Sequence, residues 1–217
     1  VFLAFEAQLA GRLGPGRAIR LWSPAERLRR PPFDPPELLE CDPVPIALQL
    51  AEWGAGSGEG LPWIDPPAPA ALQEARALLT QLQALDAQGR ITVHGRAMAS
   101  LGVHPRLAHM LLEADARGLF PLAADLAVLL SERDPLRPQD AGVDLLSRLD
   151  WLSRGQQHPL QQLARKQKQQ WRRLLPAAAV PLDAAASNRA ARHGTTGEPA
   201  NGDEAAELLS LAFPERL

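Results

Sequence analysis

Cysteine is nearly missing from this chain of 217 residues, in which Cys41 is the only one. A single cysteine excludes an intrachain disulfide and favours a reducing, cytoplasmic compartment. Long apolar runs are missing as well. The most apolar stretch, residues 119–130, contains Asp125 and is shorter than the roughly 20 residues that a membrane-spanning helix needs. The first five residues, VFLAF, lack a preceding basic segment and are followed directly by Glu6. They therefore make a poor signal peptide. We therefore expect no membrane partner.

A charge excess of one sign is also missing, because the net charge is only −2. The overall charge thus gives no support for a nucleic-acid partner. Lysine occurs only at positions 166 and 168, so arginine makes up nearly all of the 23 basic residues. The 46% hydrophobic content is typical of a globular protein. The length allows one or two domains with a real core.

Apolar spacing predicts a mainly helical chain. We expect Leu107, Met110, Leu111, Leu126 and Leu130 to be buried in the helices that carry them. Two short strands are expected, at residues 18–21 and 90–93, where Ile91 and Val93 alternate across Thr92. The expected helices cover residues 24–29, 46–53, 68–85, 105–117, 119–132, 142–153, 159–175 and 204–212.

The run RITVHGRAMASLGVHPRLAHMLLE, residues 90–113, carries the strongest family signal. It resembles the part of DEAH-box helicases where a winged-helix domain is followed by a helical ratchet domain. Its sequence is most similar to that of bacterial HrpB-type ATP-dependent helicases. Further collinear segments resemble the same family. They are GRLGPGRAIRLW at residues 11–22, PPFDPPELLECD at 31–42, residues 61–92, LAADLAVLLSERDPLRP at 122–138 and ELLSLAFPERL at 207–217.

The resemblance implies a mainly α fold with a few short strands, divided into five parts. It implies a remnant of the second RecA-like domain, a winged-helix domain, a helical ratchet (HA2-like) bundle, a linker and the start of a truncated C-terminal region. Residues 176–203 have no periodicity and are rich in Ala, Pro and Gly, so we expect a disordered linker there. The expected boundaries are 1–30, 31–103, 104–175, 176–203 and 204–217.

The motifs that bind ATP are missing from this sequence. It has neither a G-x-x-x-x-G-K-[ST] phosphate loop nor an Asp-Glu-Ala-His segment, which hold the phosphates and Mg²⁺ in such motors. Of the family's arginine-rich motif VI only Gly11-Arg12 remains, and Leu9 stands where one arginine is expected. We therefore expect an inactive C-terminal fragment whose first nine residues are foreign. Arg12 is its one candidate catalytic remnant, while ATP and Mg²⁺ belong to the missing N-terminal helicase domains.

Two groups of residues are candidates for contact with single-stranded RNA or DNA. Arg165, Lys168 and Arg172 lie on one expected helix, and a basic face suits a phosphate backbone. The alternative is a solvated surface that only aids solubility. Ser131, Arg133 and Arg137 follow the end of another helix, where the resemblance implies contact with single-stranded RNA. The alternative there is surface ion pairs of little energetic value.

Other chemistry has little support in the sequence. His94, His104 and His109 match no zinc motif, and we expect no metal site from them. Serine nucleophiles lack the surroundings that activate them. The five tryptophans are expected mostly in the core or at interfaces, with base stacking open to an exposed one.

These observations lead to one functional expectation and one alternative. The chain is expected to be an accessory, C-terminal part of an ATP-dependent RNA or DNA helicase that shapes the nucleic-acid channel. The alternative is a free-standing helical adaptor that binds protein partners or nucleic acid without ATP.

Overall fold

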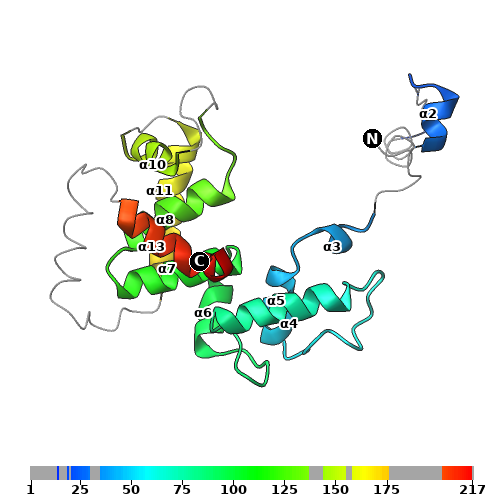
Figure 1. Cartoon of the computed structure of the whole chain (residues 1–217), viewed down its shortest axis with the longest axis horizontal. Helices are drawn as coiled ribbons and strands as arrows, with labels where there is room; N and C mark the ends of the chain where they lie inside the picture. The colour runs from blue at the N-terminus through cyan, green and yellow to red at the C-terminus, as the bar shows by residue number, and fades with distance from the viewer. Residues whose placement is uncertain are drawn as a thin grey trace.

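The computed structural model describes residues 14, 19, 21–29, 35–136, 144–154, 158–175 and 202–216. These residues form helices joined by turns, which confirms the mainly α fold class (Figure 1). Strand structure in the described part is limited to one antiparallel bridge between Leu85 and Ile91. None of the described helices combines the length and the apolar character needed to cross a lipid bilayer. The RecA-like tail and the winged helix stay predictions.

The first group of helices consists of α4 (Val44–Glu52), α5 (Pro69–Gln81) and α6 (Val93–Ser100). Proline lies in the first turn of both α4 and α5, where its missing N–H leaves no hydrogen bond unmade. Leu50 and Leu79 are buried where these two helices pack together. Two short helices precede the group: α3 (Glu37–Glu40) and α2 (Pro24–Arg29), which has no buried residue and stands apart in Figure 1.

The expected strand at residues 90–93 is wrong, because only Ile91 pairs, through its single bridge. The Thr92 side chain accepts the backbone N–H of Gly95 at 2.9 Å and caps α6, so the chain becomes helical at Val93, which is 86% exposed. Residues 19 and 21, the described positions of the other expected strand, are not in a strand either. Gly95 fits tightly, because a Cβ there would lie 2.2 Å from the Ala84 carbonyl oxygen.

The second group consists of α7 (Pro105–Ala116), α8 (Phe120–Ser131), α10 (Leu145–Arg154), α11 (Pro159–Leu174) and α13 (Gly202–Ala212). Helix α8 is central, since it contacts all four of the others. Leu107, Met110, Leu111 and Leu126 are buried as expected. Leu130 is not buried. Val128 is the last buried residue of α8, and Leu130 in the following turn is 42% exposed. Helix α7 also contacts α4 and α6 and so joins the two groups.

The last helix, α13, packs across α7 and α8 (Figure 1). Leu208 on α13 is fully buried. Nη1 of Arg106, in the first turn of α7, donates to the Ala212 carbonyl at 3.1 Å and to Glu215 at 2.8 Å. Glu215 belongs to the 3₁₀ turn η1 (Pro214–Arg216). The expected linker lies outside the described residues over 176–201, but its last two positions, 202 and 203, already belong to α13.

Candidate nucleic-acid interface

Helix α11 carries most of the predicted basic residues. It begins after His158, whose ring accepts the backbone N–H of Leu160 at 3.2 Å, while Gln161 accepts the His158 N–H at 3.2 Å. These bonds satisfy donors that a helix start otherwise leaves unpaired. Trp171 is buried on the face that packs against α8. Leu160, Gln161 and Ala164 of α11 are buried as well.

Two of the three predicted contacts on α11 are engaged in ion pairs within the chain. Nζ of Lys168 lies 2.5 Å from Oδ1 of Asp125 on α8, and the side chains are 30% and 20% exposed. Burial raises the pKa of the Asp125 carboxyl, although Lys168 opposes that shift. Arg172 pairs with Asp115 on α7. The acids come from other helices, which is why the sequence of α11 alone gave no sign of them. Arg165 is exposed.

The outward side of α11 offers a different basic surface. Lys166 and Arg173 are exposed and line a hollow of about 470 Å³ together with Gln169, Gln170 and Leu174. We call these residues the outer strip of α11. Within the described part of the chain, neither Lys166 nor Arg173 pairs with a carboxylate. Both are basic in the sequence, but their separation from the acids of α7 and α8 appears only in the fold.

The other predicted group lies where α8 ends. Ser131 is the last residue of α8, and Arg133 lies in the exposed segment that follows the helix. The neighbouring Asp134 pairs with Arg148 of α10 at 2.6 Å, and hydrogen bonding from that arginine lowers the Asp134 pKa. Arg133 itself pairs with no carboxylate among the described residues. Arg137, like the catalytic candidate Arg12, lies outside the described residues.

The second predicted group lies away from Lys168 and Arg172. Lys168 meets Asp125 and Arg172 lies over the Phe120 ring, 5.4 Å from its centroid. Going from Lys168 to Arg172 along α11, the contacted residue on α8 moves back from Asp125 to Phe120. The two helices are therefore antiparallel. Ser131 and Arg133 consequently lie toward the start of α11, and Arg173 lies at its opposite end.

Among the tryptophans, Trp171 is buried and Trp53 is the exposed one, at 70%. Trp53 borders a hollow of about 420 Å³ that is also lined by Arg76, Arg90 and Arg96. An exposed indole beside cationic groups can stack on a base while they contact its phosphate. The sequence left base stacking open for an exposed tryptophan but could not indicate which one, because these arginines come to line the hollow beside Trp53 only in the fold.

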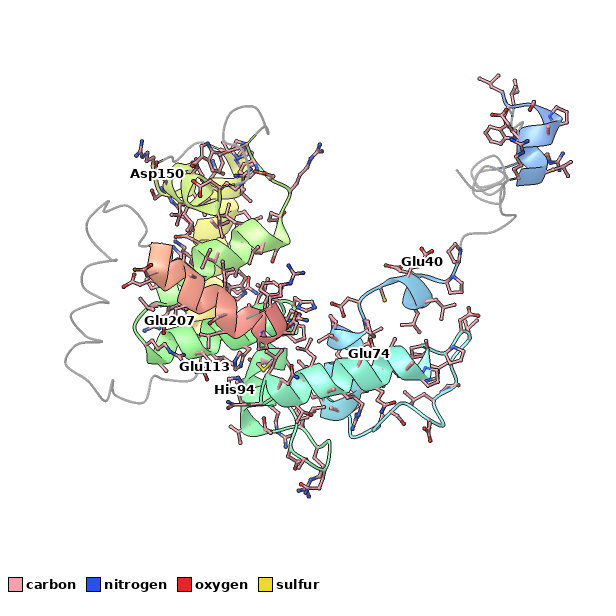
Figure 2. The ribbon with its side chains drawn as sticks, viewed as in Figure 1. Glu40, Glu74, His94, Glu113, Asp150 and Glu207 are labelled. Carbon is pink, nitrogen blue, oxygen red and sulfur yellow. The ribbon has the colours of Figure 1, made fainter. Side chains whose placement is uncertain are left out.

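His94 and His109, from which the sequence led us to expect no metal site, lie side by side in the fold. Nε2 of His94 lies 2.8 Å from Nδ1 of His109, and a carboxylate oxygen of Glu113 completes a group within 4.8 Å. Figure 2 shows His94 and Glu113 close together where α6 meets α7. Burial lowers the His109 pKa to about 4, and burial also lowers that of His94, so both rings are neutral at pH 7. We call these three residues the histidine–glutamate cluster.

His104, in contrast, stands outside that cluster. Its Nε2 lies 2.9 Å from Asp42 Oδ2, and its Nδ1 accepts the backbone N–H of Arg106 at 3.3 Å. The Asp42 carboxylate also accepts the Val44 N–H at 2.9 Å, so this pair ties the start of α4 to the start of α7.

Comparisons with known proteins identify the relatives of this fold. No family model matches the chain. It is 34% identical over 149 residues to the ATP-dependent RNA helicase HrpB of Escherichia coli K12, an alignment that covers 68% of this chain and 18% of HrpB. It is 36% identical over 136 residues to HrpA of the same organism, covering 60% of this chain and 10% of HrpA. The yeast probable ATP-dependent RNA helicase DHR1 is 33% identical over 141 residues, with 64% and 11% covered.

Solved structures give the same result. Two crystal structures of Escherichia coli HrpB match with TM-scores of 0.66 and 0.65, at 26% and 30% identity. Each match covers 100% of this chain and 23% or 24% of HrpB. The chain thus spans about a fifth of the length of HrpB. Sequence and fold agree that the chain belongs to the HrpB-type DEAH-box helicases, of which it spans a part.

Proposed function

We propose that this chain is the C-terminal, accessory part of an ATP-dependent RNA helicase and that its helices line the path of a single-stranded nucleic acid. The family membership and the match of the whole chain to HrpB support the proposal. In this proposal the chemistry of ATP and Mg²⁺ belongs to helicase domains outside this sequence, because the phosphate loop and the Asp-Glu-Ala-His segment are not in it. The chain contributes positions that hold the strand between steps.

The outer strip of α11 is the observation that carries the nucleic-acid contact. Lys166 and Arg173 present positive charge on one exposed side, and the amides of Gln169 and Gln170 lie between them. Cations that neutralise phosphates release condensed counterions, and amides can donate to phosphate oxygens. Such contacts to the phosphate backbone do not depend on the base sequence. A helicase needs this, because the strand moves through it whatever its bases are.

The ion pairs on α11 change which residues should be tested. Lys168 and Arg172 hold α11 against α8 and α7, so replacing them perturbs the fold together with any binding. Lys166 and Arg173 are free of that complication. Arg133 at the end of α8 is a second, separate contact, and Ser131 beside it can donate to phosphate or sugar.

Anisotropy of a labelled single-stranded oligouridine measures the binding directly. We expect Lys166→Gln/Arg173→Gln to weaken binding about tenfold at low salt. The slope of the logarithm of the binding constant against the logarithm of the salt concentration should become smaller by about 1–2. Arg27→Gln/Arg29→Gln is the matched control, because it removes the same charge from exposed positions on α2 and should bind within twofold of the parent chain.

Equal binding by both double variants would refute the role of the outer strip. Failure of the parent chain to bind at low salt would favour the free-standing adaptor instead. A separate measurement of phosphate release with ATP, Mg²⁺ and RNA should give only the background rate. Turnover stimulated by RNA would contradict our assignment of ATP chemistry to the other domains.

A further inference from the structure

The histidine–glutamate cluster gathers metal-ligating groups from two helices. His94 is the second residue of α6, and its Nε2 faces Nδ1 of His109 at 2.8 Å. Glu113 is one turn beyond His109 on α7, and residues four apart share one face of a helix. One ligand atom from each residue lies within 4.8 Å of the others.

These separations suit one small cation. At Zn–N distances of 2.0–2.1 Å, two imidazole nitrogens on a tetrahedral ion lie about 3.3 Å apart. The 2.8 Å contact between His94 and His109 therefore needs to open by only about half an ångström to admit an ion, by the same geometry. We propose that His94, His109 and Glu113 form a binding site for a divalent transition metal of the zinc class.

The donor set determines the class of metal. Two imidazoles and one carboxylate suit Zn²⁺, Co²⁺ or Ni²⁺, whereas Mg²⁺ and Ca²⁺ prefer shells made of oxygen. His109 is 6% exposed and closes the inner side of the site, while His94 and Glu113 are half-buried. The outer side can admit the ion and leaves a coordination position for water. A bound ion would link α6 to α7 and so fasten the first helix group to the second.

Arg117 controls the carboxylate of the cluster. Its Nη1 donates to Oε2 of Glu113 at 2.7 Å and to the Glu113 backbone carbonyl at 2.8 Å. This ion pair engages the carboxylate and so competes with a bound ion for it. The same guanidinium repels a cation. Neutralising Arg117 should therefore strengthen metal binding, which a site made of the histidines alone would show much less.

Titration of the full chain with Zn²⁺, after EDTA treatment and dialysis, tests the proposal. Calorimetry should find one site per chain, and Co²⁺ should give the visible absorption of a tetrahedral complex. His94→Gln and Glu113→Gln should each weaken Zn²⁺ affinity about tenfold or more. Arg117→Gln should strengthen it severalfold. His94 is the preferred target because His109 is buried, and circular dichroism verifies the fold of each variant.

His104→Gln is the matched control, since His104 pairs with Asp42 away from the cluster. This variant should keep the affinity of the parent chain. Zn²⁺ affinity that is unchanged by both His94→Gln and Glu113→Gln, or absence of saturable binding, would overturn the proposal. An unchanged affinity in Arg117→Gln would overturn the assignment of Glu113 as a ligand.

Discussion

The ion pair between Lys168 and Asp125 offers a direct measure of what α11 contributes to the fold. Exposed pairs stabilise proteins by about 0.2–1 kcal/mol, and breaking a buried pair costs about 3–5 kcal/mol. The two side chains are 30% and 20% exposed, so they lie between these limits. Lys168→Met should therefore lower the free energy of unfolding by about 2 kcal/mol at pH 7. Lys166→Met on the same helix should change it by less than about 0.5 kcal/mol.

The pH dependence provides a second test of the same reasoning. Burial already raises the Asp125 pKa with Lys168 present, and Lys168 is the group that opposes this rise. Without Lys168 the folded-state pKa rises further above the unfolded value. The folded state then binds a proton more readily than the unfolded chain, so stability increases as the pH falls. The cost of Lys168→Met should consequently be smaller at pH 5 than at pH 7.

Urea denaturation followed by circular dichroism measures these differences. The double variant Asp125→Leu/Lys168→Met should recover to within about 1 kcal/mol of the parent chain, because replacing both charges removes the unpaired carboxylate. A Lys168→Met variant as stable as Lys166→Met would refute the reasoning. It would show that Lys168 is solvated surface and return it to the candidates for nucleic-acid contact.

Three further outcomes are expected from other parts of the fold. Met110→Ala should cost about 2–5 kcal/mol in a urea denaturation, because Met110 is fully buried, whereas Leu130→Ala should cost under about 1 kcal/mol; equal costs would contradict the observed burial. Gly95→Ala should lower the melting temperature, since its Cβ would strike backbone, while Gly202→Ala at the start of α13, where the nearest atom is 3.4 Å away, should not; a stabilised Gly95→Ala would refute the close contact. In chelator, the chain should lose about 1–2 kcal/mol between pH 7 and pH 5 through His109, because its folded pKa of about 4 lies below the unfolded value and the unfolded chain gains the proton first. His94, Glu113 and Arg117 surround this ring, and His109→Gln should flatten that part of the pH profile.

The helices could be predicted because their signals are local. Apolar spacing and proline in the first turn determined where α7 and α8 lie, and Met110 and Leu126 are buried accordingly. The expected strand near Ile91 failed because a threonine cap outweighs a short alternation of β-branched residues. Thr92 satisfies the N–H of Gly95 at once and leaves room for only one bridge.

The candidate site was only partly predictable, because its key contacts join residues distant in the sequence. Lys168 and Asp125 are on different helices, and so are His94 and His109. Spacing along one segment reports neither contact. The basic character of α11 was evident from its composition, but the division into paired and outward-facing cations depends on which helices pack beside it.

The contact between α7 and α13 has a consequence for how the chain is synthesised. Arg106 and Glu215 are 109 positions apart, yet their side chains meet, and Leu208 of α13 is fully buried against the second helix group. A chain leaving the ribosome exposes α7 and α8 before α13 is synthesised, so the apolar surface that α13 covers stays open until α13 emerges. Contacts between such distant positions form late, because a long loop must close first. During that interval the nascent bundle is open to aggregation and to chaperones.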